Sequence, residues 1–387
     1  MAKIELTGVT KRFGKMTALD DINLEIRNNE FFVLFGPAGA GKTTLLNSIA
    51  GIQLPEQGVI KFDGEIINKI DPAHRNVAVV FENYALYPNL TVYENIASPL
   101  RSPLYKKDRE TIDKEVKRVA AMLRIEKLLD RLPSQLSNGQ RQRVAIGRAL
   151  VRSPRVFLMD EPLAHLDAKL RHYMRSELKE MQSSFNSTCI YVTHDFMEAM
   201  SLGDRIAIIN QGRIVQIGTR EEVYYMPCNE FVAALVGEPE INFVEGRLVK
   251  QDEECFVQIM NLDLISVPQG HELENRLCSG EITELHLGFR PQNLKYCFEE
   301  KKGCLHGTVY SFESIGNKAV LIAKAGDTLL RMIAPNDLKV KLDQDVFIEL
   351  PIEKAIFFDA RTSDYIGIFN EEAIRRLSQE PQCREVI

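Results

Sequence analysis

The sequence lacks any uninterrupted run of about 18 apolar residues, the length that a membrane-spanning helix requires, so we expect no transmembrane segment. The first residues, MAKIELTGVTKRFG, carry charges at Lys3 and Glu5 and contain no apolar core, so we expect no signal peptide. The seven cysteines form no CxxC pair, and their odd number and wide spacing are typical of reduced thiols in a cytoplasmic protein. Any association with a membrane must therefore depend on a partner.

The chain also lacks an excess of positive charge. Its 48 basic and 54 acidic residues give a net charge of −6, which argues against a nucleic-acid-binding protein that relies on bulk electrostatic attraction. Hydrophobic residues make up 45% of the chain and charged residues 26%, as in ordinary soluble globular proteins. A length of 387 residues is sufficient for two domains, each with a core of its own.

Residues 1–235 alternate between strand-like and helix-like stretches, which predicts an α/β fold with a largely parallel central sheet. The strand-like stretches include FFVLFG (31–36), RVFLMDEP (155–162) and CIYVTHD (189–195), and the helix-like ones include 110–129 and 168–184. The stretch RIAIINQGRIVQIG (205–218) predicts a hairpin that turns at Asn210-Gln211-Gly212.

Residues 236–387 have a different texture, with short alternating stretches such as HGTVYSFESIG, KAVLIAK and DVFIELP. This pattern predicts a small all-β domain. We place the domain boundary at residues 235 and 236 because Gly237 and Pro239 interrupt the helical pattern that precedes them. The second domain shows no catalytic constellation, so we expect regulation, dimer contacts or simple stabilisation from it.

The strongest chemical signal is GPAGAGKT at residues 36–43, which fits the pattern G-x-x-x-x-G-K-[ST]. Its glycines leave room for backbone N–H groups to wrap a polyphosphate at the start of a helix. Lys42 supplies positive charge for the β- and γ-phosphates, and the hydroxyl of Thr43 can ligate Mg²⁺. Short glycine-rich patterns also arise by chance, but this one lies between a buried strand and a helix, as a phosphate-binding loop must.

Two further strand ends carry polar side chains. The strand in VFLMDEP delivers Asp160 to a Mg²⁺ shell and Glu161 beside it, where Glu161 can polarise an attacking water. The strand in CIYVTHD ends at His194, a candidate sensor of the γ-phosphate. Read alone, the acidic pair fits a solvated strand end and the histidine fits a structural role, but a preceding phosphate-binding loop favours the functional reading of the pair.

The stretch LSNGQRQRVAIGRALV (136–151) predicts a second anion-binding site. Ser137 and Gly139 lie just before a helix, where a hydroxyl, backbone amides and the helix dipole can bind phosphate. Since the chain already contains one phosphate-binding loop, this second one implies a nucleotide held between two subunits. Read in isolation, the stretch fits a capped helix with Ser137 as its N-cap and an arginine-rich solvated face.

Together these motifs resemble the ATP-binding subunits of ATP-binding cassette (ABC) transporters, whose motif order is reproduced over residues 1–235. The implied fold is a P-loop ABC ATPase domain of α/β class with a helical subdomain, followed by a small all-β, OB-like (TOBE-type) domain. The implied ATP contacts are Phe13 on adenine, the Walker A residues Gly36, Pro37, Ala38, Gly39, Ala40, Gly41, Lys42, Thr43 and Thr44, the signature residues Ser137, Asn138, Gly139 and Gln140, and Asp167 of the D-loop AHLD. The implied catalytic residues are Lys42, Glu82 of the Q-loop, Glu161 and the switch histidine His194, and the implied Mg²⁺ ligands are Thr43, Glu82 and Asp160.

A motif in the last third of the chain and two earlier stretches limit the resemblance to one group of ABC transporters. GFRPQNL (288–294), YALYPNLTVYENI (84–96) and GRALVRSPRVFLMDEPLAHLDAKLR (147–171) resemble the ATPases of maltose-type sugar importers. The family implies a peripheral location on the cytoplasmic face of the inner membrane and a second ATPase subunit. It also implies two permeases that contact the surface around Tyr84–Asn95, an extracytoplasmic solute-binding protein as an indirect partner, and no nucleic acid. The solute implied by resemblance is a carbohydrate or polyol.

Other functions stay open at this point. A related importer moves polyamines, iron or inorganic anions with a similar cassette and β domain. A soluble ABC protein of ribosomes or DNA usually carries two cassettes or a long coiled-coil insertion, and neither is evident here. A regulatory chain that binds ATP and sequesters a transcription factor is a third alternative.

Three positions depart from the family pattern: Glu82 replaces the Q-loop glutamine, Asn138 replaces the first signature glycine, and His165 lies in the D-loop. A carboxylate at position 82 is a good Mg²⁺ ligand but adds negative charge near the γ-phosphate. Asparagine tolerates left-handed backbone geometry, so the signature loop survives, although its side chain crowds the phosphate. Three departures in the motifs of one phosphate site favour a heterodimer with a similar but non-identical ATPase. Neutral drift explains any single departure.

Overall fold

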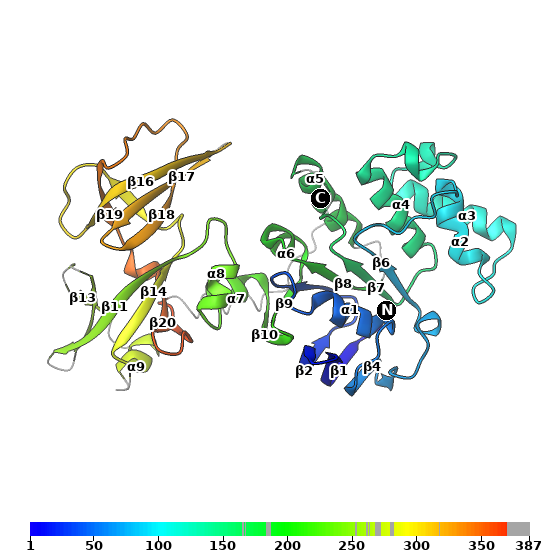
Figure 1. Ribbon diagram of the computed structural model, residues 1–387, viewed down its shortest axis with the longest axis horizontal. Coiled ribbons are helices and arrows are strands. Elements are labelled where there is room, and N and C mark those ends of the chain that lie inside the picture. Colours follow the sequence, from blue (N-terminus) through cyan, green and yellow to red (C-terminus); the bar gives the residue numbers. More distant parts are fainter. Residues whose placement is uncertain are drawn as a thin grey trace. The chain divides into compact units, whose positions relative to one another are not determined.

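The computed structural model describes residues 1–164, 166, 168–182, 187–251, 254–260, 262, 264–267, 272–278, 282–316 and 318–369. The chain forms two compact units, Met1–Arg220 and Glu221–Ile387 (Figure 1). Each unit contains a hydrophobic core of its own.

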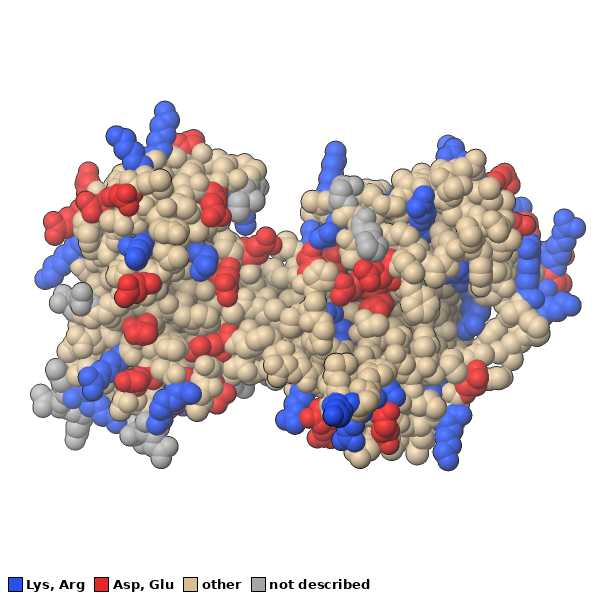
Figure 2. Space-filling view, in the orientation of Figure 1, with Lys and Arg blue, Asp and Glu red and all other residues tan. Residues whose placement is uncertain are grey.

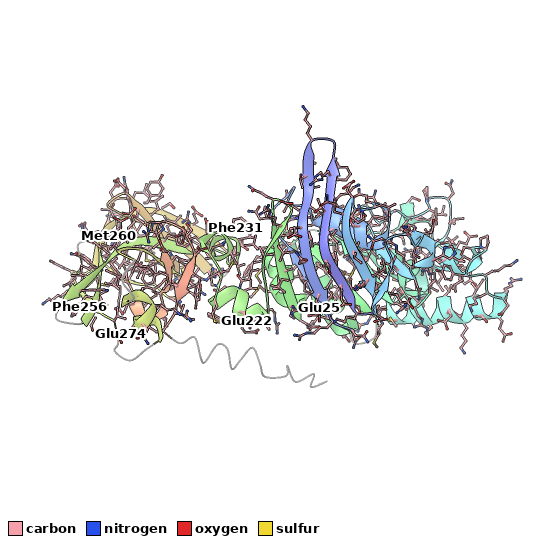
Figure 3. The ribbon with its side chains drawn as sticks, turned by 90° about the horizontal axis from the view of Figure 1, so that it is seen from below. Glu25, Glu222, Phe231, Phe256, Met260 and Glu274 are labelled. Atoms are coloured by element: carbon pink, nitrogen blue, oxygen red, sulfur yellow. The ribbon has the colours of Figure 1, made fainter. Side chains whose placement is uncertain are left out.

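Unit 1 begins with a four-stranded antiparallel sheet in the order β2-β1-β4-β5. Its strands are β1 (Ile4–Phe13), β2 (Met16–Ile26), β4 (Gln57–Phe62) and β5 (Glu65–Ile66). Alternate residues of β1 and β2, such as Ile4, Leu6 and Ile26, are buried, so one face of this sheet packs on the core. The long hairpin of β1 and β2 extends out from the rest of unit 1 (Figure 3).

The central sheet of unit 1 has six strands in the order β10-β9-β3-β8-β7-β6. They are β3 (Phe31–Phe35), β6 (Val77–Val80), β7 (Val156–Asp160), β8 (Thr188–Thr193), β9 (Arg205–Asn210) and β10 (Arg213–Gly218). β6, β7, β8, β3 and β9 pair in parallel. All residues of β3, β7 and β8 are buried, which explains why these strands read as continuous apolar runs rather than alternating ones. This arrangement confirms the predicted α/β fold.

The predicted hairpin is present, since β9 and β10 pair in antiparallel fashion. Gln211 and Gly212 connect the two strands with φ angles of 47° and 76°. Two consecutive positive φ angles are the geometry of a tight hairpin turn, for which glycine is the favoured residue.

The described part of unit 1 also contains six α-helices: α1 (Lys42–Ala50), α2 (Val92–Arg101), α3 (Arg109–Met122), α4 (Asn138–Leu150), α5 (Ala168–Gln182) and α6 (Phe196–Leu202). α2, α3 and α4 pack on one another beyond the β6 edge of the sheet (Figure 1). They form the predicted helical subdomain. Side-chain caps define where these helices begin: Thr91 and Ser137 form capping boxes, and Asp108 accepts from the backbone of Thr111.

Unit 2 is mostly β-structure, as predicted from its alternating pattern. One sheet has the order β13-β12-β11-β14-β20-β21 and the other β15-β19-β16-β17-β18. The strands are β11 (Asn242–Gln251), β12 (Glu254–Ile259), β13 (Ile265–Ser266), β14 (Glu284–Phe289), β15 (Lys295–Cys297), β16 (Leu305–Ile315), β17 (Lys318–Ala325), β18 (Thr328–Ala334), β19 (Asp345–Glu349), β20 (Ile356–Asp359) and β21 (Tyr365–Gly367), and the helices are α7 (Arg220–Tyr225), α8 (Glu230–Leu235) and α9 (Glu272–Cys278). One buried cluster, which includes Val257, Leu287 and Leu330, joins residues from both sheets.

The two units divide between Arg220 and Glu221, before the boundary expected at residues 235 and 236. The helical segment α7–α8 accounts for the difference, because it packs with the β-structure that follows it. The buried guanidinium of Arg290 donates to the carbonyl oxygens of Tyr224 (2.6 Å), Ala233 (2.9 Å) and Val236. α8 ends at Leu235 with Val236 as its C-cap, and Gly237 lies beyond it, inside the second compact unit.

The structure contradicts, at one residue, the expectation that the cysteines are reduced. Cys255 is disulfide-bonded, so the prediction that the thiols are reduced is wrong for this residue. Cys189, Cys228, Cys297 and Cys304 are free.

No helix in the described part of the chain is long and apolar enough to cross a membrane. On the face shown in Figure 2, basic and acidic side chains are interspersed over both units. This mixture accords with the modest net charge of −6.

Candidate functional site

Four neighbouring strands bring the candidate residues to one edge of the central sheet. β3, β8, β7 and β6 are adjacent and parallel, so their carboxyl ends lie at the same edge. The Walker A loop follows β3, His194 follows β8, Asp160 ends β7, and Glu82 lies two residues beyond β6. Ligands of open α/β sheets bind outside the carboxyl ends of the strands. The sheet order therefore assembles the predicted site from four separate parts of the sequence.

The loop at residues 36–41 is held tightly at two glycines. A Cβ atom at Gly36 would lie 2.2 Å from the carbonyl oxygen of Ile209, and one at Gly41 would lie 2.6 Å from that of Ala18. The N–H of Gly212 also donates to the carbonyl oxygen of Ala40 at 2.9 Å. Neighbouring strands thus support the loop from behind and leave its other side available to a ligand.

Gly41 is the N-cap of α1 with a φ of 105°, a conformation that favours glycine. Lys42 and Thr43 are the first residues of this helix, whose opening N–H groups have no partners within the helix. Ala38, Gly39 and Thr43 are exposed, whereas Ala40 and Lys42 are buried and Pro37 and Thr44 lie between. The loop and helix start have the geometry that binds phosphate at a helix N-terminus.

The buried Lys42 ammonium occupies the centre of the site. Its Nζ donates to the carbonyl oxygens of Gly36 and Pro37, both at 3.0 Å, and lies 3.5 Å from Oε1 of Glu161. The side chain is only 5% exposed. Because the ammonium group is already held in position, it would not have to become ordered when a polyphosphate binds.

Asp160 is a buried carboxylate that accepts a hydrogen bond from the Thr43 hydroxyl at 3.1 Å. Burial raises its pKa, the Thr43 hydrogen bond lowers it, and the negative charges of Glu161 and Glu82 raise it again. Three carboxylates thus share this edge with Lys42, an excess of negative charge that a divalent cation would relieve.

The residues present fit Mg²⁺, since Thr43, Asp160 and Glu82 offer hard oxygen atoms. Within the described residues no group of three or more His, Cys, Asp or Glu side chains could by itself hold a metal ion. Mg²⁺ needs no such group, because it is usually bound through one or two carboxylates plus phosphate and water oxygens.

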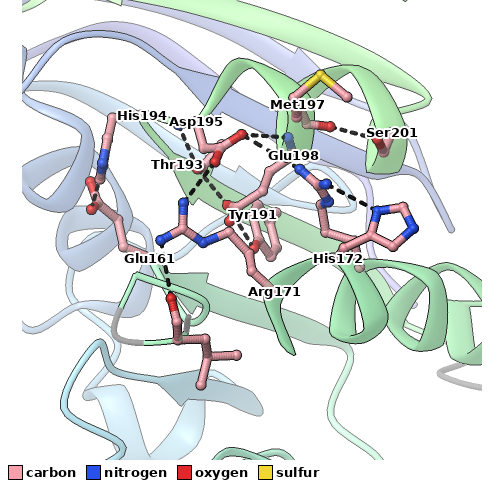
Figure 4. A network of polar contacts seen from close by, with 12 residues as sticks. Glu161, Arg171, His172, Tyr191, Thr193, His194, Asp195, Met197, Glu198 and Ser201 are labelled. Atoms are coloured by element: carbon pink, nitrogen blue, oxygen red, sulfur yellow. Dashed lines mark hydrogen bonds and ion pairs between the residues drawn. The ribbon is translucent and has the colours of Figure 1, made fainter. Parts of the chain in front are cut away.

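Glu161 and His194 contact each other directly across the ends of β7 and β8 (Figure 4). Nδ1 of His194 lies 2.7 Å from Oε2 of Glu161. Because a carboxylate can only accept, Nδ1 carries the hydrogen in this contact, which leaves Nε2 of the half-exposed ring as the nitrogen for a further contact. Glu161 has a φ of 44°, a left-handed conformation that non-glycine residues seldom adopt and that strained functional sites often contain.

A polar network behind His194 fixes the loop that carries it, and no sequence pattern indicated this network. Asp195 caps α6 by accepting from the N–H of Glu198 at 3.0 Å, and its Oδ2 lies 3.1 Å from Nη1 of Arg171 in α5 (Figure 4). The other Nη of Arg171 donates to the carbonyl oxygen of Leu166 at 3.3 Å. Position 166 belongs to the D-loop, so Arg171 links that loop to the residue after His194.

The signature residues begin α4. Ser137 is its N-cap, and its hydroxyl accepts from the N–H of Gln140 at 3.4 Å while the Gln140 side chain accepts from the N–H of Ser137 at 3.0 Å. The predicted N-cap is therefore confirmed, but the predicted arginine-rich solvated face is not, because Arg141, Arg143 and Arg148 are only partly exposed and donate to backbone carbonyl oxygens. Gly139 is buried, and a Cβ there would lie 3.1 Å from Leu170.

One expectation about the signature is wrong. Asn138 is the first residue of α4 and has helical backbone geometry rather than a left-handed conformation. Its tolerance of positive φ is therefore irrelevant here, because a helical position accepts asparagine at modest cost. The substitution of glycine by asparagine changes what the exposed helix start presents to a ligand, not the path of the backbone.

Of the remaining candidates, Phe13 lies apart from this cluster, Glu82 lies at the same sheet edge, and two lie outside the described residues. Phe13 is 42% exposed at the tip of the β1–β2 hairpin, with Nζ of Lys11 5.2 Å from its ring centroid. Glu82 is exposed. His165 and Asp167 of the D-loop lie outside the described residues.

Arg75 is a further residue that the sequence patterns missed. Its buried guanidinium donates to the carbonyl oxygens of Ser48 (3.1 Å) and Ile49 (3.0 Å) near the C-terminal end of α1. A cation at this end of a helix stabilises the helix dipole. Arg75 thus supports α1 from the end opposite the phosphate-binding loop.

Comparison with known proteins places these features in a family. A model of the ABC transporter family matches residues 19–164. The chain is 39% identical over 378 residues to the trehalose/maltose import ATP-binding protein of Thermococcus litoralis, with 95% of this chain and 100% of that protein covered. It is 38% identical over 367 residues to an sn-glycerol-3-phosphate import ATP-binding protein of Rhizobium johnstonii, with 95% and 96% covered.

Solved structures resemble the cassette part of the chain. A dimeric ATP-binding cassette in a post-hydrolysis state with ADP and Pi has a TM-score of 0.50 at 32% identity, covering 56% of this chain and 98% of that one. The cbiO1 part of an ABC transporter complex of Clostridium perfringens has a TM-score of 0.52 at 29% identity, covering 57% and 89%.

Proposed function

This chain belongs to the family of ABC transporter ATP-binding proteins and is an ATPase of that family, and we propose that it powers the import of a carbohydrate or polyol. The observation that carries the ATP-driven part of this proposal is the convergence of Lys42, Asp160, Glu161 and His194 at one sheet edge. The relatives named above, which span nearly the whole chain, are import ATP-binding proteins for trehalose and maltose and for sn-glycerol 3-phosphate.

In the proposed site, the triphosphate of ATP lies on the loop at residues 36–41 and the start of α1. Backbone N–H groups and Lys42 bind the β- and γ-phosphates, and the exposed Phe13 ring stacks on adenine. Thr43, Asp160 and Glu82 would hold Mg²⁺, which when bound neutralises charge that develops on the phosphate oxygens.

For hydrolysis, Glu161 orients the attacking water and accepts its proton. Its two oxygen atoms face Lys42 and His194, so the carboxylate is fixed before a substrate arrives. His194 contacts the γ-phosphate through Nε2 and keeps Nδ1 on Glu161. The Asp195–Arg171 contact holds this histidine in place, because the backbone of residue 195 cannot shift without losing it.

A second ATPase subunit completes each site. The exposed start of α4 at Ser137 and Asn138 would face a nucleotide bound to the partner, with the helix dipole directed at the γ-phosphate. ATP between the two chains then favours the closed pair, because these contacts are absent in the open one. The dimeric cassette with ADP and Pi supports this arrangement by analogy.

We place this pair on the cytoplasmic face of the membrane, bound to two permease subunits. The segment Tyr84–Asn95, which includes the first turn of α2, and the rest of that helix would receive them. Tyr87 in this segment is 52% exposed, as an aromatic contact residue would be. An extracytoplasmic solute-binding protein is an indirect partner through the permeases.

Affinity purification of the tagged chain from detergent-solubilised membranes tests this function. We expect two polytopic membrane proteins to co-purify with it in a fixed ratio. Recovery with ribosomes, DNA or a soluble transcription regulator, and without any polytopic protein, would contradict the proposal and favour a soluble ABC protein.

The choice of solute rests on the relatives alone, since permeases and binding proteins select it. Mass spectrometry of the small molecule that remains bound to the purified cognate binding protein tests this choice. A sugar, polyol or glycerol phosphate is the expected result, whereas a polyamine, iron or an inorganic anion would identify one of the alternative importers.

We predict that the intact transporter contains two different ATPase subunits. In a homodimer each site would contain both Glu82 and Asn138, whereas in a heterodimer each site would contain only one of them. Burial raises the pKa of Asp160, and the nearby charges of Glu161 and Glu82 raise it further, so Glu82 adds to an existing excess of negative charge. Native mass spectrometry of the purified complex should resolve two ATPase masses. Two identical copies that hydrolyse ATP at a full rate would refute the heterodimer.

We also predict that truncation of unit 2 leaves ATP binding intact, and that the best place to end the chain is Arg220. A chain that ends at Leu235 keeps α7 and α8 but loses the residues they pack on, such as Phe358, which shares an apolar cluster with Ala233 and Met226. We therefore expect residues 1–220 to bind ATP within about twofold of the full chain and residues 1–235 to aggregate more readily. Calorimetric titration with ATP and size-exclusion chromatography measure both effects. Loss of ATP binding in both truncated chains would contradict the prediction.

A further inference from the structure

The segment between β6 and α2 contains two consecutive residues in left-handed backbone conformation. Tyr84 has a φ of 62° and Ala85 a φ of 44°. Neither residue is glycine, so each is strained, and strained residues persist only where their surroundings determine the conformation. Glu82 lies in the same segment, two residues before Tyr84.

Arg148 of α4 supplies the restraint. Its Nη2 donates to the carbonyl oxygen of Tyr84 at 2.9 Å, and its Nη1 donates to that of Ala85 at 2.6 Å. The guanidinium also lies 5.4 Å from the ring centroid of Tyr87. Burial lowers the pKa of Arg148, but an arginine remains charged at neutral pH. A planar group with two donors on successive carbonyls selects one backbone geometry, which a lysine cannot do.

The two ends of this segment are attached to different elements. The N–H of Tyr84 donates to the carbonyl oxygen of Phe81, one residue beyond β6, at 2.9 Å. At the other end the fully buried Asn95 of α2 accepts from the N–H of Tyr87 at 2.9 Å and donates to its carbonyl oxygen at 3.0 Å. Arg148 therefore connects the middle of the segment to a third element, α4.

The helix α4 begins at the signature residues, with Ser137 as its N-cap. Arg148 is ten residues after Asn138, the first helical residue, which at 1.5 Å per residue is about 15 Å along the helix. A hydrogen-bonded helix of this length transmits a displacement of its start to its end. The strained dipeptide is thus fixed to the same rigid element that presents Ser137 and Asn138.

We propose that Arg148 is a positioning residue that couples the segment carrying Glu82 to the signature helix, so that the two move together. The inference rests on the proposed function, because it assigns a purpose to the link between the permease-facing segment and the signature. Arg148 itself contacts no nucleotide in this account. It sets the backbone of residues 82–87, and Glu82 reaches the γ-phosphate side of the site only when α4 holds that backbone.

Hydrogen exchange on the full-length chain tests the restraint directly. In Arg148→Lys we expect the amides of residues 82–87 to exchange at least about tenfold faster than in the wild type, since the two-pronged hydrogen bond is lost. Amides of β3 should exchange at unchanged rates. Arg152→Lys is a matched control, because Arg152 donates to the carbonyl oxygen of Val77 and lies over the Tyr105 ring without contacting residue 84 or 85. Unchanged exchange at residues 82–87 in Arg148→Lys would overturn the proposal.

Steady-state kinetics of the purified membrane complex separate positioning from mere stabilisation. Arg148→Lys should lower kcat for ATP about tenfold and leave KM within about twofold, because the nucleotide contacts remain. Ala85→Gly removes the backbone strain at that position, so adding it to Arg148→Lys should restore much of kcat. An equal effect on kcat and KM with no restoration by Ala85→Gly would show a purely structural role. A wild-type complex without polytopic partners would instead refute the proposed function, and the exchange result would still decide the role of Arg148.

Discussion

The variant Glu161→Gln is expected to bind ATP with near-normal affinity but to hydrolyse it at least about a hundredfold more slowly, the usual contribution of a positioned general base. Glutamine has the same shape as glutamate, so its amide oxygen can still accept from Nδ1 of His194, which lies 2.7 Å from the carboxylate. It cannot take a proton from water. ATP-bound dimers should therefore accumulate, and single-turnover hydrolysis with equilibrium ATP binding measures both effects.

Glu65→Gln provides a matched control, since Glu65 is exposed in the short strand β5. It removes one carboxylate of the same unit and should leave both ATP affinity and hydrolysis unchanged. Hydrolysis at the normal rate in Glu161→Gln would show that Glu161 is not the general base, and His194 would become the next candidate.

The variant Lys42→Ala is expected to bind ATP at least about tenfold more weakly and to lose measurable hydrolysis, because hydrogen bonds to charged groups are strong when buried. The ammonium is 5% exposed and faces Glu161 at 3.5 Å. Without it, Asp160, Glu161 and Glu82 repel the incoming triphosphate. Calorimetric titration with ATP and Mg²⁺ measures the loss of affinity.

Lys69→Ala serves as the control for loss of one positive charge from unit 1, since Lys69 is exposed in a loop. Its ATP affinity should match that of the wild type. If Lys42→Ala bound ATP as tightly as this control, the phosphate contact assigned to Lys42 would be incorrect.

Features determined by local spacing were predictable from the sequence. The glycine spacing of residues 36–41 requires a tight loop, and that loop follows a buried strand as expected. The hairpin at Gln211 and Gly212 was predictable for the same reason, because few residues accept positive φ. Ser137 as an N-cap followed from the helical pattern after it. In each case a few neighbouring residues contain the whole signal.

Features that join distant parts of the chain were not predictable. Arg148 and Ala85 are 63 residues apart in sequence, and Asp195 and Arg171 are 24 apart. From the sequence alone, an arginine on a helix is expected to be solvated. Only the fold shows which backbone carbonyl it contacts. The position of the domain boundary was not predictable for the same reason, because Arg290 donates to the carbonyl oxygen of Ala233, which is 57 residues away in the sequence. The disulfide at Cys255 was not predicted either, because the spacing of the cysteines did not indicate it.

The most direct test of the central claim is the ATP hydrolysis rate of the membrane complex, purified through this chain and reconstituted in lipid vesicles. The rate is measured without and with the binding protein, which is used as purified, with its solute still bound. We predict that the loaded binding protein raises the rate and that this rise is absent when this chain carries Glu161→Gln. A rate that is unaffected by the binding protein, or that is unchanged by Glu161→Gln, would contradict the claim that the Glu161 site powers import.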